Sequence, residues 1–555
     1  MAFWQKQKTY QHLTPDEIFL DTGNLPEFET DQFEGVIEKP IHSSIIIFFG
    51  VFLALAIIIV FGRIFYLQVF EGERYLALSR ANNLEHKVLF TERGVLYDRN
   101  QKELAWNKNG RAYLSLPGFA HLLGYVGYPT EEEISEYEYH PKELLGREGV
   151  ERIYNNTLRG RTGLQIVEVD VTGSVLSEAV LAESVDGENI TLSVDSRLQT
   201  KLFSIIRDLA RERGFSGGSG IMMDVHTGEI VALSNYPEYS PQMLSQGASQ
   251  EYVDLLRNDK GNPFLNRAIQ GVYTPGSIFK PFIALAALQE KIISPEKVIF
   301  TNGSLQIPNP YVPGEFTEFP DWKNHGPVTM LDAIAVSSNV YFFQLGGGYT
   351  DQRGLGIERI ERYAKMFGFG KNTESGFIGE EEGLIPTPQW KKETFNDDWR
   401  IGDTYNSSIG QYGFGVTPLQ VVRAVSVIAN GGTLIKPTLI AGVNGSKHDI
   451  DIDEKHLSTV SRGMREAVIR GTATGLFLPD VSIAAKTGTA EIDVSKTLVN
   501  SWVMGFFPYE NPRYAFTVVM ERGPRENYIG GVFAVRQLVE WMLVNTPEYF
   551  TEEPI

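Results

Sequence analysis

The feature that most constrains this chain is an uncharged apolar run from Ser43 to Gly62. About 20 residues at 1.5 Å rise make a helix of about 30 Å, the thickness of the hydrocarbon core of a bilayer. We interpret 43–66 as a single transmembrane helix. The alternative is a cleaved signal peptide, but 42 residues precede the run and no small-residue cleavage site follows it. The sequence therefore predicts a membrane anchor, with 1–42 as a tail.

The charges that flank the apolar run do not fix its orientation. The tail contains Lys6, Lys8 and Lys39 among eight acidic residues, whereas Arg63 and Arg74 lie beyond the run. The positive-inside rule counts Lys and Arg near the ends of a span, and here both ends carry them. The orientation therefore has to come from the chemistry of the remaining residues.

The composition is typical of an ordered protein that does not bind nucleic acid. Hydrophobic residues make up 42% of the chain, with 24 Tyr and 33 Phe, which is too apolar for a disordered chain. The net charge of -19 argues against nucleic-acid binding, because phosphate contacts require clustered Lys and Arg. The chain has no cysteine, which excludes disulfides, thiolate metal sites and cysteine nucleophiles.

The residues beyond the apolar run divide into two predicted domains. The first, 67–190, alternates short strand-like runs with Gly and charged clusters, and we expect an extended β-rich module. The second, 191–548, begins with a long helical stretch, carries strand pairs at 221–235 and 501–521, and ends with a further helix. Strands at both ends with helices between them predict an α+β domain, in which helices flank an antiparallel sheet.

The first candidate catalytic pair follows a Pro-Gly break in the second domain. Ser277 opens an apolar helix there, and Lys280 lies on the same helical face. A serine hydroxyl is a poor nucleophile unless a base takes its proton, and a lysine can do so if burial or a nearby cation lowers its pKa. The alternative is that Ser277 only caps the helix. Ser294 and Lys297 have the same Ser-x-x-Lys spacing, but there Ser-Pro is typical of an ordinary N-cap followed by proline at the first helical position.

A second motif, Ser-x-Asn, occurs once in the chain, after a helical run. Ser337 is a candidate proton shuttle, and Asn339 is a candidate group for holding a substrate amide. Such a triplet is also common at helix ends and turns, so it predicts little by itself.

A third motif, Lys-Thr-Gly, interrupts a strand pattern near the end of the second domain. Gly488 would let a ligand or another backbone approach the strand closely. Lys486 with Thr487 and Thr489 would suit an acyl group that ends in a carboxylate. The alternative is a bulge at the strand end with a solvated lysine.

The three motifs occur in the order Ser-x-x-Lys, Ser-x-Asn, Lys-Thr-Gly. With this order the chain resembles the penicillin-binding proteins, specifically the monofunctional class B transpeptidases. The resemblance covers residues 93–105, 146–163, 191–198, 266–282, 407–420 and 486–508. The segment 266–282 and Trp502 are more similar to the elongation type, penicillin-binding protein 2, than to the division type, which is the alternative.

The resemblance implies a peptidoglycan D,D-transpeptidase that cross-links stem peptides during cell-wall elongation and maintains cell shape. It implies that Ser277 attacks the D-Ala-D-Ala carbonyl, that Lys280 activates Ser277, and that Ser337 passes the proton to the departing D-Ala. Asn339 would orient the peptide backbone, and Lys486 would tune the electrostatics of the site.

The resemblance also implies how the acyl donor is held. Thr487 and Thr489, beside Gly488, would bind the terminal carboxylate of the donor or of a β-lactam. The backbone N–H groups of Ser277 and Thr489 would form the oxyanion hole.

The same resemblance implies location and partners. The acyl acceptor lies in the wall, so 67–190, a pedestal or dimerisation-type domain, and 191–548 are expected outside the bacterial inner membrane, in the periplasm or extracellular space. The tail 1–42 is then cytoplasmic. The implied partners are stem peptides ending in D-Ala-D-Ala, β-lactams as covalent inhibitors, and a SEDS-type glycosyltransferase in the membrane. No cofactor is expected.

A departure from the family bears on metal binding. Some elongation-type relatives hold zinc with an Asp, Asp, His, Cys set, and Ser338 stands where the Cys would be. Asp321 and His325 remain, but a structural zinc site normally has four protein ligands. We therefore predict no metal. Elemental analysis of protein purified without chelators is expected to find no stoichiometric zinc, and one equivalent per chain would contradict this.

Other functions share the serine motif. A β-lactamase or D,D-carboxypeptidase would pass the acyl group to water; class A β-lactamases add a Glu in a Glu-x-x-Leu-Asn context, which is absent after Asn339. A membrane β-lactam sensor usually has several spans, and a scaffold with a decayed site should have lost a motif. This sequence has one clear span and all three motifs.

Overall fold

The computed structural model describes residues 43–551, apart from 83, 138, 170–174, 310–311, 493–494 and 496. The predicted tail 1–42 lies outside the described residues. The chain forms two compact units. Within the described residues, the smaller combines 43–86 with 166–179, and the larger combines 87–165 with 180–551.

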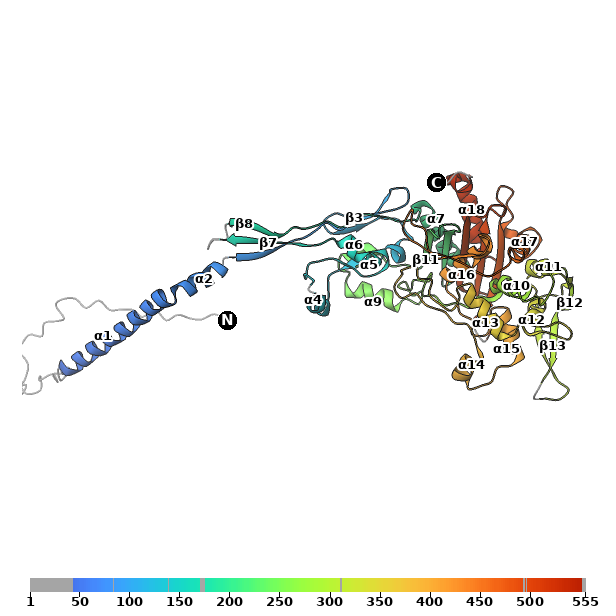
Figure 1. Cartoon of the computed structure of the whole chain (residues 1–555), viewed down its shortest axis with the longest axis horizontal. Coiled ribbons are helices and arrows are strands. Elements are labelled where there is room, and N and C mark those ends of the chain that lie inside the picture. The colour runs from blue at the N-terminus through green and yellow to red at the C-terminus, as the bar shows by residue number, and fades with distance from the viewer. Residues whose placement is uncertain are drawn as a thin grey trace, which may run out of the picture. The chain divides into compact units, whose positions relative to one another are not determined.

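The smaller unit contains the long apolar helix. Helix α1 spans Ser43–Phe65 and has no buried residue, and the π-helical turn η3, Tyr66–Phe70, continues it (Figure 1). Helix α2, Gly72–Asn82, follows. Among the described residues, the stretch formed by α1 and η3 is the one helix long and apolar enough to cross a membrane. The prediction of one apolar helix near the N-terminus is therefore confirmed.

The region that follows is built from short strands. Strands β1 (Leu84–Leu89), β7 (Gly163–Val169) and β8 (Val175–Ala182) form a three-stranded sheet in the order β1-β7-β8. A four-stranded sheet has the order β4-β3-β2-β9, and two strands, β5 and β6, pair separately. These strands are β2 (Leu96–Tyr97), β3 (Glu103–Asn107), β4 (Arg111–Tyr113), β5 (Val126–Gly127), β6 (Leu145–Gly146) and β9 (Ile190–Thr191). The predicted short strands are present, and the short helices α3 (Ala120–Leu123), α4 (Glu131–Tyr137) and α6 (Asn155–Arg159) lie among them.

A buried ion cluster holds this region together within the larger unit. The Glu151 carboxylate accepts hydrogen bonds from Arg93 Nε and Arg111 Nε, each at 2.6 Å, and all three side chains are buried. Removing one member of a buried ion pair typically costs about 3–5 kcal/mol, because the remaining charge is left uncompensated. The cluster therefore fixes how helix α5 (Gly149–Ile153) packs against the short strands.

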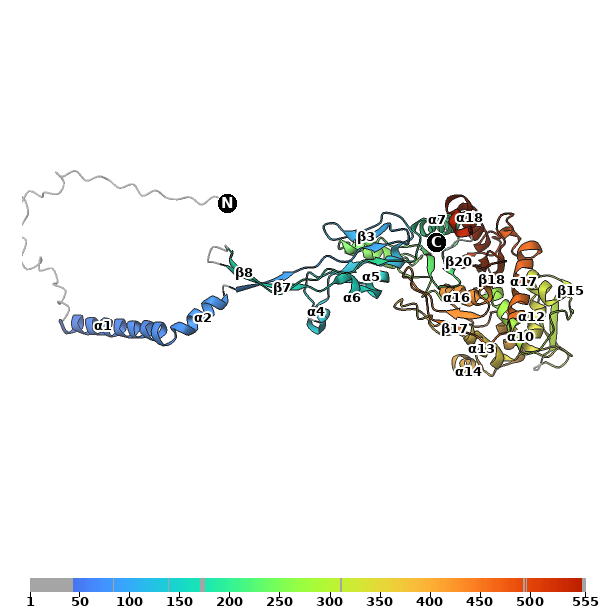
Figure 2. The ribbon, with the colours of Figure 1, turned by 45° about the horizontal axis from the view of Figure 1, so that its top comes forward.

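The second domain is built around a five-stranded antiparallel sheet in the order β11-β10-β20-β19-β18 (Figures 1 and 2). The strands are β10 (Gly217–Asp224), β11 (Ile230–Tyr236), β18 (Ala484–Glu491), β19 (Leu498–Phe507) and β20 (Tyr514–Pro524). Both predicted strand pairs are present as β10–β11 and β19–β20. Strand β18, which carries the Lys-Thr-Gly motif, lies at an edge of the sheet.

Helices cover both faces of this sheet. Helices α7 (Ser196–Arg213) and α18 (Gly531–Asn545) pack together on one face, as Figure 2 shows, and α16 (Pro418–Ala429) packs on β10, β19 and β20. Successive side chains of a strand point to opposite faces. Val503 accordingly joins the apolar cluster of α7 and α18, whereas Trp502 joins the cluster that contains α16. The predicted α+β architecture is confirmed.

Most of the helices between β11 and β18 form a second layer, whereas α8 (Pro241–Ser245) contacts strands β4 and β5, and Leu256 of α9 (Gln250–Asn258) packs with Ala120 of the preceding region. Helix α10, Lys280–Gln289, is buried along nearly its whole length, which explains its apolar composition. The others are α11 (Met330–Val336), α12 (Asn339–Gly347), α13 (Ile357–Met366), α14 (Pro388–Phe395), α15 (Ile401–Ser408) and α17 (Glu454–Arg470). Three strand pairs complete the layer: β12 (Ile299–Thr301) with β15 (Gly326–Val328), β13 (Ser304–Pro308) with β14 (Phe316–Pro320), and β16 (Thr433–Ile435) with β17 (Lys447–Asp449).

Candidate active site

Ser277 lies on a tight turn that precedes α10. The turn is the 3-10 helix η4, Gly276–Phe279, and α10 itself begins at Lys280. Gly276 has φ +57°, and its N–H donates to the carbonyl of Gly410 at 2.9 Å, which fixes the turn against a neighbouring loop. Ser277 is half-buried and is the N-cap of neither helix. The capping interpretation of Ser277 therefore does not fit the geometry.

Lys280 is buried completely, one turn along from Ser277. Its Nζ donates to the Ser337 carbonyl at 2.7 Å, to Ser337 Oγ at 3.2 Å and to Asn339 Oδ1 at 2.7 Å. Burial lowers the pKa of Lys280 to about 7, against the opposing effect of Asp321. A lysine with this pKa is partly neutral at physiological pH, so it can accept a proton.

The Ser-x-Asn motif forms the turn between α11 and α12. Ser337 ends α11 with φ +59°, a left-handed conformation that is uncommon outside glycine. Ser338 caps α12, and its hydroxyl accepts from the N–H of Tyr341. The turn directs the Ser337 carbonyl and the Asn339 side chain toward Lys280.

Lys486 reaches the same turn from strand β18. Its Nζ donates to Ser337 Oγ at 2.8 Å and to the Thr487 carbonyl at 2.9 Å. Burial and the nearby charge of Lys280 hold the pKa of Lys486 well below its usual value. The hydroxyl of Ser337 thus contacts two buried amines, which makes it a path for a proton between them.

The rest of the Lys-Thr-Gly strand runs beside the Ser277 turn. A Cβ added to Gly488 would lie 3.0 Å from both the Pro275 carbonyl and Ile278 Cγ2, so a side chain there would push the strand away. Thr487 and Thr489 lie on the same strand face by the period of two. Thr487 is half-buried and Thr489 is exposed, so both are accessible to a ligand.

The structure therefore brings all three motifs to one place. Hydrogen bonds join Lys280, Ser337, Asn339 and Lys486, while Ser277 and the residues of β18 lie beside them. The second Ser-x-x-Lys pair is elsewhere, since the Nζ of Lys297 donates to the side chain of Gln352.

Two residues of the site were not assigned to it from the sequence. Thr472 accepts a hydrogen bond from Thr487 Oγ1 at 2.7 Å and so orients that hydroxyl. Asp321, considered only as a metal ligand, binds the Ser-x-Asn turn directly. No motif marked either residue, because each acts through a contact between segments distant in the sequence.

The described residues contain no group of three or more His, Cys, Asp or Glu side chains that could hold a metal ion. His325 Nε2 lies 3.7 Å from Asp321 Oδ1, and the hydroxyl of Ser338 contacts the other oxygen of Asp321. These side chains therefore do not form a recognisable zinc site. The absence of bound metal stays a prediction, which the elemental analysis above tests.

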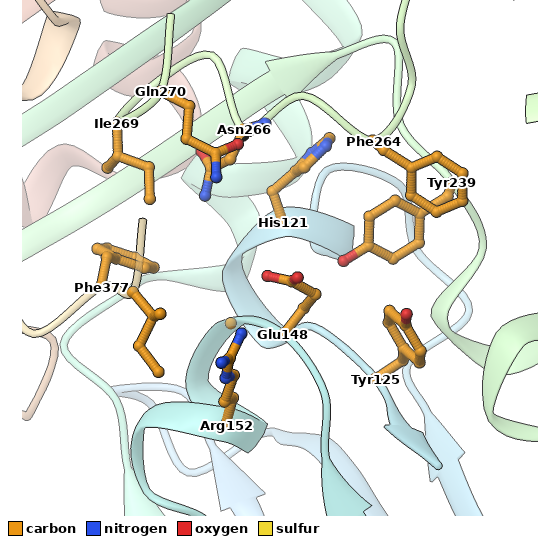
Figure 3. Close-up of a pocket in the computed structure, with 12 residues that line it drawn as sticks. His121, Tyr125, Glu148, Arg152, Tyr239, Phe264, Asn266, Ile269, Gln270 and Phe377 are labelled. Atoms are coloured by element: carbon orange, nitrogen blue, oxygen red, sulfur yellow. Dashed lines mark hydrogen bonds between the residues drawn. The ribbon is translucent and has the colours of Figure 1, made fainter. Parts of the chain in front are cut away.

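A separate pocket lies away from the three motifs, and none of its lining residues belongs to them (Figure 3). His121, Glu148 and Arg152 line it together with aromatic side chains and amides. Burial lowers the pKa of His121 to about 3, so its imidazole is neutral.

Comparison with known proteins agrees with the fold and the site. Residues 218–535 match the model of the penicillin binding protein transpeptidase domain, and residues 108–192 match that of the penicillin-binding protein dimerisation domain. Since the first match alone covers more than half of the chain, the chain belongs to the family of penicillin-binding protein transpeptidases.

Several of the similar proteins are named MrdA or PBP2, and another is the peptidoglycan D,D-transpeptidase FtsI of Buchnera aphidicola, 27% identical over 86% of this chain and 91% of its own length. The peptidoglycan D,D-transpeptidase MrdA of Acinetobacter baumannii is 32% identical over 73% of this chain and 62% of its own length. The penicillin-binding protein PBP2 of Helicobacter pylori, solved in complex with MreC, has a TM-score of 0.72 at 25% identity, covering 83% of this chain and 99% of that one. A chain of a peptidoglycan synthase complex has a TM-score of 0.72 at 26% identity, covering 90% and 98%. The predicted resemblance to penicillin-binding protein 2 is confirmed.

Proposed function

We propose that this chain is a serine-type peptidoglycan D,D-transpeptidase of the elongation type, which forms an acyl-enzyme on Ser277. The observation that carries the proposal is the position of Lys280. Its buried amine follows Ser277 by one turn and contacts Ser337 and Asn339, while Lys486 contacts the same Ser337 hydroxyl. A lowered pKa, a nucleophile and a proton path are thus combined in one site.

Acylation uses these groups in sequence. The neutral amine of Lys280 takes the proton of Ser277 as Oγ bonds to the carbonyl carbon of the penultimate D-Ala. The bond from that carbon to the terminal D-Ala nitrogen then breaks, and Ser337 Oγ delivers a proton to the departing amine. The N–H groups of Ser277 and Thr489 stabilise the oxyanion, and each such donor typically contributes about 3 kcal/mol.

The second half of the reaction reverses the first. An amine of another stem peptide attacks the carbonyl carbon of the ester, and its proton passes through Ser337 to the lysines. The bond from that carbon to Ser277 Oγ then breaks, and Oγ takes up a proton. Thr487 and Thr489, beside Gly488, bind the carboxylate of the donor before acylation. That carboxylate leaves with the D-Ala, so the carboxylate site on strand β18 is free before the acceptor binds.

The location and partners follow from this chemistry. The wall lies outside the membrane, so α1 would anchor the chain in the bacterial inner membrane with 67–190 and 191–548 outside as pedestal and transpeptidase domains. We propose a SEDS-type glycosyltransferase as membrane partner, because a new cross-link needs a newly polymerised strand. The similarity to a chain of a peptidoglycan synthase complex supports a polymerase partner.

Mass spectrometry after penicillin treatment tests the proposal. We expect one adduct with the mass of the intact penicillin, stable for hours, on the peptide that contains Ser277. The peptide that contains Ser294 has the same Ser-x-x-Lys spacing and should stay unmodified. Rapid loss of the adduct with release of hydrolysed penicillin would instead favour a β-lactamase, and an adduct at another residue would remove Ser277 from its role.

A further inference from the structure

Asp321 lies directly after strand β14, at the N-terminus of helix α12. Its carboxylate is fully buried and accepts from the Ser338 hydroxyl at 2.6 Å, from the Asn339 N–H at 2.9 Å and from the Val340 N–H at 3.0 Å. A carboxylate at a helix N-terminus satisfies free N–H groups and is stabilised by the helix dipole. Both of its oxygens are engaged by the same short segment.

That segment is the turn that presents the second motif. Ser337, immediately before it, has a left-handed backbone conformation that typically costs about 1–3 kcal/mol and needs surrounding contacts to persist. Asp321 accepts hydrogen bonds from the three residues that follow Ser337, so it holds the turn in place. The Ser337 carbonyl and Asn339 Oδ1 then stay within 2.7 Å of Lys280 Nζ.

Charge gives Asp321 a second effect. Lys280 on α10 and Lys486 on β18 are both buried and contact the same hydroxyl, so their positive charges oppose each other. Asp321 is the negative group that acts on Lys280 and partly opposes the effect of burial. His325, which faces Asp321, has a pKa lowered by burial and by the charges of Lys280 and Lys323, so it remains neutral and does not cancel that anion.

We propose that Asp321 is a positioning residue for the acylation of Ser277: its buried carboxylate clamps the Ser337–Asn339 turn onto Lys280 and supplies the negative charge beneath the two lysines. This inference rests on the proposed function. Asp321 acts through the turn, whose hydrogen bonds it accepts, and through Lys280.

The test is Asp321→Asn, with the acylation rate by fluorescent penicillin resolved into a binding constant and a rate constant across pH. We expect the rate constant at neutral pH to fall at least about 10-fold with little change in binding, since the clamp loses an acceptor. Removing the anion also lowers the pKa of Lys280, so the acidic limb of the rate profile should move to lower pH. A merely structural role would leave that limb in place.

Two variants serve as controls. Ser338→Ala removes the hydrogen bond to Asp321 and the cap on the Tyr341 N–H but keeps the charge, so we expect a smaller loss of rate and an unmoved acidic limb. Asp321→Glu keeps the charge but displaces the carboxylate by one methylene, so a reduced rate with an unmoved limb is expected; if Asp321→Asn does not fold, this variant carries the test.

The outcomes separate the two proposals. A wild-type chain that forms no adduct on Ser277 would overturn the proposed function. A wild-type chain that does so, together with folded Asp321→Asn whose rate constant and acidic limb are unchanged, would overturn the role of Asp321 alone. A wild-type rate in Asp321→Glu, where it has to carry the test, would also overturn it.

Discussion

Ser277→Ala is expected to abolish covalent labelling by fluorescent penicillin while the chain stays folded. No bond to the carbonyl carbon can form without the hydroxyl, so labelling should fall below detection. The side chain is half-buried on the η4 turn, and alanine removes one oxygen without creating a large cavity. Changes at such positions typically stay within about 0.5 kcal/mol, so the Tm should shift by no more than about 3 °C. Gel fluorescence and calorimetry measure the two quantities.

Ser294→Ala is the matched control for this variant. It removes the serine of the other Ser-x-x-Lys pair, whose lysine contacts Gln352 and not the motif residues. Labelling of this variant should equal that of the wild type. Undiminished labelling of Ser277→Ala, with its Tm intact, would show that the covalent bond forms elsewhere.

Local patterns in the sequence were sufficient to predict most of the architecture. The uncharged run predicts α1 because no soluble helix tolerates such a surface exposed to water. The strand pair around 501–521 forms β19 and β20, since its β-branched and aromatic residues flank a turn sequence. These features depend on residues that are close together in the sequence, so the sequence alone is enough to predict them.

The geometry of the site could not be read in the same way. Lys280 meets Asn339 across 59 positions and Lys486 meets Ser337 across 149, so no local pattern encodes either contact. The motif order brought these residues together only through resemblance to a family. Contacts without a motif, such as Thr472 with Thr487, were missed altogether, because a lone threonine is usually a solvated or capping residue.

The start of the serine helix shows where local reasoning was partly right. The pattern predicted a helix that opens at Ser277, but α10 begins at Lys280 and the preceding residues form a 3-10 turn. Gly276 adopts a positive φ there and meets Gly410 through the backbone, a contact from a distant segment. The tighter turn leaves Ser277 accessible, whereas Lys280 is buried.

Lys280→Ala is expected to slow acylation of Ser277 by at least about 10²-fold, the lower end of what general-base catalysis supplies. The wild-type rate should fall as the pH drops below the lysine pKa of about 7, because only the neutral amine accepts a proton. The variant should lose this acidic limb and show a slow, nearly flat profile. Stopped-flow measurement of acylation from pH 5 to about 9 tests both expectations over the range in which a lysine of this kind titrates.

Lys280→Arg separates the base from the charge at this position. Arginine keeps a cation and donors beside Ser337 and Asn339 but cannot lose its proton at physiological pH. If Lys280 acts as the base, Lys280→Arg should be as slow as Lys280→Ala, although the positive charge is retained. A rate near that of the wild type would mean that the cation alone matters. The proton of Ser277 would then have to leave by way of Ser337 and Lys486, which are hydrogen-bonded to each other.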